Sequence, residues 1–237
     1  MDKNGILYIV ATPIGNLEDI TLRALRILKE VDLIACEDTR VTRKLLNHYS
    51  IATHSIAFHQ HTDSEKTQKI IEDLKGGKNI ALVTDAGTPG VSDPGNKLVE
   101  AAIAAEIIVL PIPGASAIAS IVSVAGIDMQ QFTFLGFPPH KKGRETYFKK
   151  VAASKIPVMY YESPHRVLKN LELLAELSKT EFDSESEKNS GKAKKIILGR
   201  ELTKMFEEVV RGSIEEVLKY FQEIPSKVKG EFVIIVH

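Results

Sequence analysis

The stretch that best defines the fold reads Ile80-Ala81-Leu82-Val83-Thr84-Asp85-Ala86-Gly87-Thr88-Pro89-Gly90. Its first five residues lack polar alternation, which is typical of a strand buried on both faces of a parallel sheet. The glycines and prolines of the turn that follows are explained by turn geometry. Asp85 is not, because a carboxylate beside a buried strand needs a partner such as backbone amides or a ligand ammonium group. We therefore favour a functional role for this turn.

Two more strand-to-helix turns have the same character. One runs from Thr12 to Thr21 after the apolar run Ile6 to Ala11, and the other runs from Pro111 to Ala117 after Ile107 to Leu110. Open α/β sheets bind ligands at the carboxyl ends of their strands, so three such turns predict a shared binding site. Ordinary helix capping and tight helix packing are the alternatives.

Apolar β-branched runs alternate with amphipathic segments through the first half, which predicts an α/β fold with a mostly parallel sheet. Longer helical stretches in the second half favour a mixed sheet there. The predicted strands lie at about Ile6–Ala11, Val31–Cys36, Ile56–Phe58, Ile80–Thr84, Ile107–Leu110, Phe132–Phe137, Val158–Glu162, Lys195–Gly199 and Phe232–Val236.

The chain is expected to form two lobes, an N-terminal lobe of residues 1–112 and a C-terminal lobe of residues 113–237. The boundary is placed near Pro111 to Pro113, because X-Pro steps force extended backbone. The polar segment Glu181 to Lys194 is rich in Ser, Glu and Lys and is predicted to be a surface loop.

The composition is that of an ordinary soluble globular protein, with 43% apolar and 26% charged residues among 237. Lys plus Arg and Asp plus Glu balance at 31 each, so any nucleic-acid binding needs a local basic patch. The single cysteine, Cys36, excludes an intramolecular disulfide and fits a reducing cytoplasm. The N-terminus carries no signal-peptide pattern. The uncharged run Ile107 to Ile127 is long enough to span a bilayer, but its prolines, glycine and serines favour a strand, a turn and a packed helix.

Several familiar chemistries are excluded. The sequence contains no P-loop, no G-x-G-x-x-G after the first strand and no G-x-S-x-G elbow. His59 and His61 have a spacing that suits a metal, but a solvated or substrate-facing pair is favoured, so no metal site is expected.

Charged motifs also border the strands of the second half. Tyr160 to Arg166 ends an apolar strand and begins a helix, which places Glu162, His165 and Arg166 at a sheet edge. A capped helix with a surface ion pair is the alternative. The segments Gly199 to Lys204 and Lys229 to Phe232 repeat this arrangement of charge beside a strand.

Seven ordered motifs resemble the tetrapyrrole methylase superfamily, specifically its ribosomal RNA small-subunit methyltransferase I branch, over nearly the whole chain. The motifs are Ala11-Thr12-Pro13-Ile14-Gly15-Asn16-Leu17-Glu18-Asp19, Glu37-Asp38-Thr39-Arg40, Asp85-Ala86-Gly87-Thr88-Pro89, Pro113-Gly114-Ala115-Ser116-Ala117, Gly136-Phe137-Pro138-Pro139, Glu162-Ser163-Pro164-His165-Arg166 and Arg200-Glu201-Leu202-Thr203-Lys204.

This resemblance implies two α/β lobes that hold S-adenosylmethionine in the cleft between them, and usually a homodimer. By analogy, the cofactor site is lined by Pro13, Ile14, Asp85, Gly87, Thr88, Ser116, Ala117, Tyr161, Leu202 and Phe232. The implied product is a 2′-O-methylated cytidine in the decoding region of the small ribosomal subunit. Many members of this branch continue into a small helical extension thought to hold RNA, whereas this sequence stops at His237; RNA docking is then expected to fall to the cleft rim and the dimer.

A ribose hydroxyl is a poor nucleophile at neutral pH, so a nearby carboxylate or lysine is expected to take or polarise its proton. We hypothesise that Glu37, Asp38, Arg40, Glu162 and Arg166 face the acceptor, with Glu162 as the favoured base. The best local phosphate contacts are Lys141, Lys142 and Arg144, for which a solvated loop is the alternative. The expected partner is small-subunit ribosomal RNA within the assembled subunit, in the cytoplasm.

Two other functions stay open on the sequence. A methylase of the same fold can act on a tetrapyrrole or another small acceptor, which would need an enclosed apolar cavity. A non-catalytic RNA-binding assembly factor can retain the cofactor fold, and methyl transfer to isolated ribosomal subunits would separate it from an enzyme.

Overall fold

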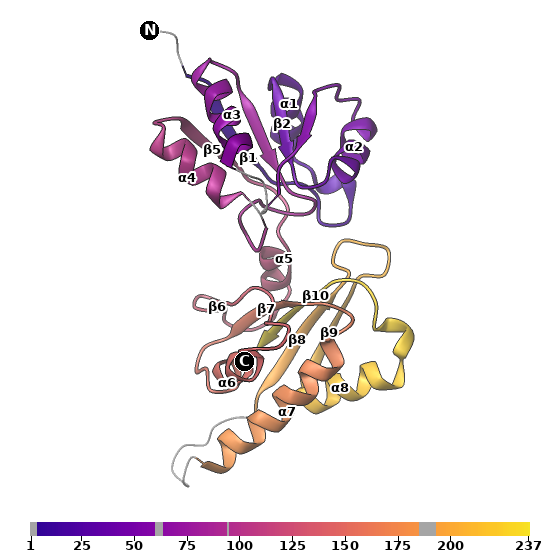
Figure 1. Cartoon of the computed structure of the whole chain (residues 1–237). Helices are drawn as coiled ribbons and strands as arrows, with labels where there is room; N and C mark the ends of the chain where they lie inside the picture. The colour runs from indigo at the N-terminus through magenta and orange to yellow at the C-terminus, as the bar shows by residue number, and fades with distance from the viewer. Residues whose placement is uncertain (1–3, 60–63, 94, 185–192) are drawn as a thin grey trace. The chain divides into compact units, whose positions relative to one another are not determined.

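The computed structural model describes residues 4–59, 64–93, 95–184 and 193–237, and its chain forms two compact units, Met1–Ser116 and Ala117–His237 (Figure 1). The first unit contains a five-stranded sheet of order β3-β2-β4-β1-β5 whose neighbouring strands are all parallel. Its elements are β1 (Ile6–Val10), η1 (Leu17–Asp19), α1 (Leu22–Glu30), β2 (Leu33–Cys36), α2 (Thr39–His48), β3 (Ser55–Ala57), α3 (Ser64–Lys75), β4 (Ile80–Val83), α4 (Asn96–Ala104) and β5 (Ile108–Ile112).

Helices cover both faces of this parallel sheet, as Figure 1 shows. One face packs against α1 and α2 through side chains such as Val10, Ile34 and Leu28. The other face packs against α3 and α4 through side chains such as Leu7 and Leu98. Burial on both faces explains why β4 is apolar at every position. The parallel sheet predicted for the first half is therefore confirmed.

The helices that follow β1 and β2 begin at side-chain caps. The Thr21 hydroxyl accepts a hydrogen bond from the Ala24 amide at 3.0 Å, and the Asp38 carboxylate accepts one from the Arg40 amide at 2.8 Å. Such caps satisfy amides that the first helical turn leaves unpaired. Capping therefore explains the presence of Thr21. Asp38 also contacts the Arg40 side chain, and its amide contacts Asp85.

The second unit contains a mixed five-stranded sheet of order β6-β7-β10-β8-β9. The β6–β7 pair is parallel and the other three pairs are antiparallel, which confirms the mixed sheet expected here. The elements are α5 (Ala117–Ser123), β6 (Thr133–Phe134), α6 (Arg144–Ala152), β7 (Val158–Glu162), α7 (Val167–Ser184), β8 (Lys195–Arg200), β9 (Glu208–Ser213), α8 (Ile214–Glu223), η2 (Pro225–Lys227) and β10 (Phe232–Val236).

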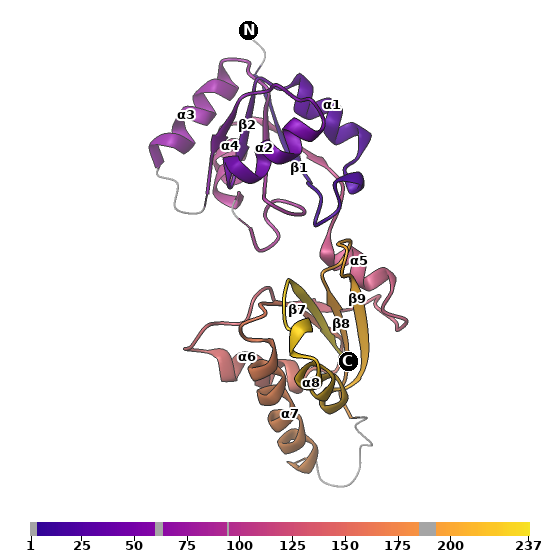
Figure 2. The same ribbon diagram turned by 90° about the vertical axis from the view of Figure 1, so that its right-hand side faces the viewer.

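Alternate residues of the central strand β10 serve two separate apolar clusters. Phe232, Ile234 and Val236 join the cluster formed with α6, α7 and α8, whereas Val233 and Ile235 join the cluster formed with α5. Side chains of a strand point to opposite faces in turn, so this alternation shows that both faces of the sheet are covered. Figure 2 shows α6, α7 and α8 on the side of this unit away from α5.

Three predictions about local structure were wrong. The strand expected at Phe132–Phe137 is reduced to Thr133–Phe134, because Gly136 adopts a φ of 64° and two prolines follow it. The edge strand β9 was not predicted, since its half-exposed sequence holds only two apolar residues and a glycine. Residues Glu181–Ser184 extend α7 instead of forming loop, because an established helix accepts polar residues in its last turn. Residues 185–192 of that predicted loop lie outside the described residues.

The uncharged run Ile107 to Ile127 forms β5, a turn and α5, as expected from its prolines and serines. In the part of the chain that the structure describes, no helix is both long and apolar enough to cross a membrane.

Gly199 offers a test of the packing between β8 and α5. A Cβ atom at this position would lie 2.8 Å from Ile121 Cδ1 and 3.1 Å from Leu202 Cδ2 and Val233 Cγ1. Gly199→Ala is therefore expected to lower the free energy of unfolding by about 1–3 kcal/mol through overpacking, as measured by urea denaturation. The control is Gly76→Ala, whose Cβ would have only ordinary contacts at 3.4 Å. Equal stability of the two variants would contradict this packing.

Candidate functional site

The turns after β1 and β4 are joined backbone to backbone. The Thr12 amide donates to the Gly87 carbonyl at 2.9 Å, and the Gly87 amide donates back to the Thr12 carbonyl at 3.0 Å. The Thr12 hydroxyl is buried and also donates to the Thr84 carbonyl at 3.0 Å. These bonds fix the two turns to each other where their parallel strands end.

The turn after β5 joins the same cluster. The Thr88 hydroxyl donates to the Ala115 carbonyl at 3.4 Å. A Cβ on Gly114 would lie 3.0 Å from the Ala11 Cβ, so a larger residue would push these turns apart. Gly87 has a φ of 83°, and a Cβ there would approach Ile14 Cγ2 to 3.3 Å. The three turns therefore converge at the carboxyl edge of the first sheet.

Three carboxylates border these turns, and we call Glu37, Asp38 and Asp85 the acidic rim. The Thr84 hydroxyl donates to Glu37 Oε2 at 2.8 Å, which orients this half-buried side chain. The Asp38 amide donates to Asp85 Oδ1 at 3.1 Å. Two adjacent strands thus bring their carboxylates together, since β2 and β4 are hydrogen-bonded neighbours.

The members of the acidic rim have different electrostatic surroundings. Hydrogen bonds from Arg40 lower the pKa of Asp38 to about 2, and the two side chains form an ion pair at 2.6 Å. Partial burial raises the pKa of Asp85 above its ordinary value, and the charges of Glu37 and Asp38 raise it further, while the Asp38 amide opposes this. Asp38 therefore stays charged and engaged, whereas a cationic ligand group beside Asp85 would relieve an unfavourable negative charge.

A second polar cluster lies in the second unit, and we call Glu162, Ser163, Arg166 and Asn170 the Glu162 cluster. The Glu162 side chain is completely buried and accepts hydrogen bonds from the Ser163 amide at 2.7 Å and from the Asn170 side-chain amide. Arg166 lies 3.4 Å from Glu162 Oε1 and donates to the Pro138 carbonyl at 2.8 Å. Sequence reasoning missed Asn170, which is the fourth residue of α7 and has no local signal.

The burial of Glu162 bears on its hypothesised role as a base. A general base must come within hydrogen-bond reach of the proton that it accepts. Both oxygens of Glu162 are already engaged inside the unit, one by Ser163 and Arg166 and the other by Asn170. This arrangement fits a carboxylate that positions Arg166 better than one that takes a proton from an acceptor.

The residues predicted to line a cofactor site fall into two groups. Pro13, Ile14, Asp85, Gly87, Thr88 and Ser116 all belong to the three converging turns of the first unit. In the second unit, Tyr161 forms ring contacts with Phe134 at 5.0 Å and Phe137 at 5.3 Å, and Leu202 packs on the cluster beside α5. The Phe232 side chain points to the opposite face, where it packs against the Phe221 ring and is only 3% exposed. Ala117 begins α5.

The remaining predicted positions can be placed as follows. Lys141 and Lys142 are exposed in the turn before α6, and Arg144 is the half-buried first residue of α6. Among the described residues no group of three His, Cys, Asp or Glu side chains is placed to hold a metal ion. His61 lies outside the described residues. The buried hydroxyl of Thr12 and that of Thr84 were not singled out from the sequence, although both directly follow apolar strands.

Comparison with known proteins gives a consistent result. The family model described as Tetrapyrrole (Corrin/Porphyrin) Methylases matches residues 6–218. A protein of Halalkalibacterium halodurans named Ribosomal RNA small subunit methyltransferase I is 44% identical over 99% of this chain and 76% of its own length. The protein of the same name from Haemophilus influenzae is 43% identical over 99% of this chain and 79% of its own length.

Solved structures share the fold at low sequence identity. The methyltransferase CobJ superposes with a TM-score of 0.67 at 17% identity, over 99% of this chain and 94% of that one. Uroporphyrin-III-C-methyltransferase from Thermus thermophilus gives a TM-score of 0.62 at 17% identity, over 98% and 94% of the two chains. Since the family model spans most of the sequence and relatives above 40% identity span nearly all of it, this chain belongs to the tetrapyrrole methylase family.

Proposed function

We propose that this protein transfers a methyl group from S-adenosylmethionine to the ribose 2′-oxygen of a cytidine in small-subunit ribosomal RNA. The observation that carries the proposal is the 44% identity, over 99% of the chain, to a relative named Ribosomal RNA small subunit methyltransferase I. The three converging turns and the acidic rim support it, because they place polar groups at the edge where α/β sheets bind ligands.

The residues of the first unit fit the proposed cofactor. Asp85 supplies a carboxylate for an ammonium group, and Thr88 supplies a hydroxyl beside the Ala115 carbonyl. Gly87 and Gly114 let the turns pack closely together, since added Cβ atoms would crowd Ile14 and Ala11. S-adenosylmethionine is an amino acid joined to a nucleoside, and the three converging turns offer it a carboxylate, a hydroxyl and a closely packed backbone. Tyr161 and Leu202 are proposed to contribute from the second unit, and Phe232 through its backbone alone.

When bound, the cofactor supplies a methyl group activated by a sulfonium, so the protein has mainly to align the acceptor and exclude water. On the acceptor side we assign proton removal to Glu37. Asp38 is committed to Arg40, and Glu162 is buried, whereas Glu37 is half-exposed and oriented by the Thr84 hydroxyl. Arg166, held by Glu162 and the Pro138 carbonyl, is proposed to contact the RNA with Arg40.

The proposal extends to the partner and the place of action. Lys141 and Lys142 are exposed, Arg144 is half-buried, and we propose that the three offer phosphate contacts to RNA. The substrate is taken to be the assembled small subunit in the cytoplasm, and the active form a homodimer. The last three points rest on the resemblance to the family and on the names of the relatives.

The proposed activity can be tested with purified protein and S-adenosylmethionine that carries a labelled methyl group. Small ribosomal subunits from cells lacking this gene are expected to gain label, and one RNA position should resist alkaline hydrolysis because its 2′-oxygen is blocked. Label that enters a uroporphyrinogen instead would favour the tetrapyrrole alternative. Subunit binding without label transfer would favour the assembly-factor alternative.

Asp85→Asn should separate stability from cofactor binding. Because the pKa of Asp85 is raised in the folded state, its contribution to stability is present below the unfolded pKa of about 3.8 and is lost as the pH rises through the folded pKa. At pH 7 the asparagine variant is therefore expected to show a higher Tm than the native protein, with no difference below about pH 4. Asparagine can still accept the Asp38 amide, so the local geometry is kept.

The same Asp85→Asn variant is expected to bind S-adenosylmethionine on the order of tenfold more weakly, because the carboxylate that faces the ammonium group is gone. Isothermal titration calorimetry measures this loss directly. Unchanged affinity would exclude Asp85 from the cofactor site.

Glu37→Gln and Glu162→Gln should affect different quantities. Glu37→Gln keeps an oxygen for Thr84 but removes the base, so kcat is expected to fall about 10²–10⁴-fold at unchanged stability. Glu162→Gln replaces one carboxylate oxygen with an NH2 group opposite the Ser163 or Asn170 donor, so it should lower the free energy of unfolding by about 1–3 kcal/mol. If fully folded Glu162→Gln lost more kcat than Glu37→Gln, Glu162 and not Glu37 would be assigned as the base.

A further inference from the structure

The segment between β8 and β9, residues 201–207, displays two large apolar side chains to solvent, and we call it the 201–207 loop. Met205 is 91% exposed and Phe206 is 67% exposed. At these exposures neither side chain is positioned by hydrophobic burial. Some other interaction must hold them in this arrangement.

Polar contacts fix the 201–207 loop from within. The Lys204 amide donates to the Glu201 carbonyl at 3.0 Å, and the Glu207 amide donates to the Lys204 carbonyl at 3.0 Å. Lys204 Nζ lies 2.8 Å from Glu201 Oε1 and 2.9 Å from Glu231 Oε2. Glu201 and Thr203 adopt positive φ angles of 49° and 67°, which are unfavourable for residues with side chains. Such strain persists only where surrounding contacts specify the backbone.

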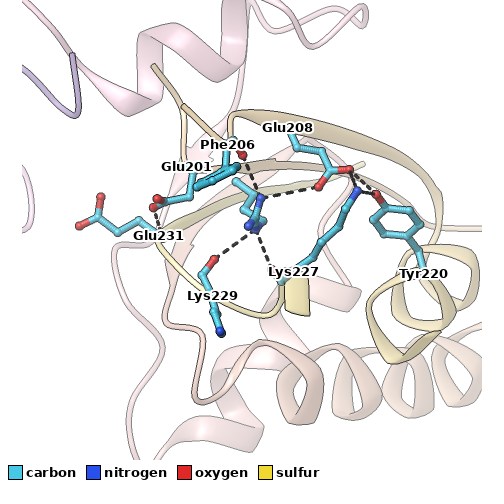
Figure 3. A network of polar contacts seen from close by, with 8 residues as sticks. Glu201, Phe206, Glu208, Tyr220, Lys227, Lys229 and Glu231 are labelled. Carbon is cyan, nitrogen blue, oxygen red and sulfur yellow. Dashed lines mark hydrogen bonds and ion pairs between the residues drawn. The ribbon is translucent and has the colours of Figure 1, made fainter. Parts of the chain in front are cut away.

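Arg200 holds the loop through backbone carbonyls, and Figure 3 labels Phe206, Lys227 and Lys229, which carry these carbonyls. Its buried guanidinium donates to the Phe206 carbonyl at 2.9 Å and to the carbonyls of Lys227 at 2.6 Å and Lys229 at 3.2 Å. Glu208 balances this charge at 3.8 Å and also accepts from Lys227 at 2.6 Å. Arg200 therefore connects the Phe206 backbone to residues 227–229, which precede β10. The backbone that carries the Phe206 ring is fixed by this contact.

Most cations around the loop are paired, whereas the exposed Lys229 side chain forms no ion pair with the described residues. Lys204 is held by Glu201 and Glu231, and Lys227 and Arg200 are held by Glu208. A surface that binds RNA phosphates needs several uncompensated cations, and only Lys229 among these is unpaired, so the surroundings of Phe206 offer little to the RNA backbone. They suit a flat, uncharged group.

The size of the apolar patch also restricts its occupant. Two side chains of this kind offer on the order of 300 Å² at most. A stable interface with a second protein copy buries roughly 800 Å² per partner. A single nucleobase needs much less and stacks on aromatic side chains without regard to charge.

We propose that Phe206, supported by Met205, is a stacking platform for an unstacked base of the RNA substrate. The inference rests on the proposed function, since it deepens the contact with RNA that the relatives' names suggest. Leu202 of the same loop is a proposed cofactor contact, so the platform and that contact belong to one segment of the chain. Arg200 and Lys204 already order the loop in the free protein, so RNA binding does not carry the entropic cost of ordering it.

The test uses the full chain, small ribosomal subunits as substrate and Phe206→Ala as the main variant. Loss of one stacked base is expected to raise KM for the subunits about 5- to 150-fold. Phe206→Tyr should retain the native KM, because it keeps the ring. Ile103→Ala removes a side chain that is 63% exposed on α4 and is the matched control, expected to leave KM unchanged.

Further readouts distinguish stacking from other roles. The dissociation constant for S-adenosylmethionine and the Tm of Phe206→Ala should equal those of the native protein, and the slope of RNA affinity against salt should stay the same because no phosphate contact is lost. An unchanged KM in Phe206→Ala, with the native protein active, would overturn the platform and leave the proposed function intact. A shift of the monomer–dimer equilibrium in sedimentation with unchanged KM would also overturn it and assign the loop to a second copy. An inactive native protein would instead refute the proposed function.

Discussion

The pair of backbone hydrogen bonds between Thr12 and Gly87 is the constraint on which the first unit's functional edge depends. It joins the turns of two neighbouring strands, and it requires a residue at position 87 that accepts a φ of 83°. Once these turns are fixed, Thr84 can orient Glu37, and the Asp38 amide can reach Asp85. The positions of the acidic rim therefore follow from a backbone contact rather than from attraction between side chains, which all carry the same charge.

Carboxylates in the two units show how surroundings determine what the same chemical group can do. Glu162 is enclosed, with each oxygen occupied, and its negative charge is matched by Arg166. Asp85 reaches solvent in part and lies among other acids, so its charge is poorly compensated within the unit. A carboxylate such as Glu162 stabilises the local structure. A carboxylate such as Asp85 is stabilised most by a cationic ligand.

Sequence patterns predicted most of the fold, because buried strands leave continuous apolar runs and because turns at the ends of parallel strands carry glycine and proline. Asp85 was singled out because a carboxylate beside a buried strand needs a partner, and in the structure the Asp38 amide is one such partner. The edge strand β9 was missed because one of its faces is half-exposed, which breaks the apolar run that marks a strand. Asn170 could not be found from the sequence, because its partner Glu162 is eight residues away and only the approach of α7 to the end of β7 brings them together. The burial of Glu162 depends in the same way on long-range packing.

Cys36 ends β2 directly before the acidic rim, and it is the only cysteine in the chain. Its side chain is fully buried, its thiol donates to the Ile56 carbonyl, and burial raises the pKa of that thiol. A thiol reagent attacks the thiolate and needs access, so the native edge of the sheet protects this sulfur. Alkylation of Cys36 thus proceeds only when β2 separates from its surroundings. The alkylation rate of the native protein therefore measures how often the edge of the sheet beside the acidic rim unfolds locally.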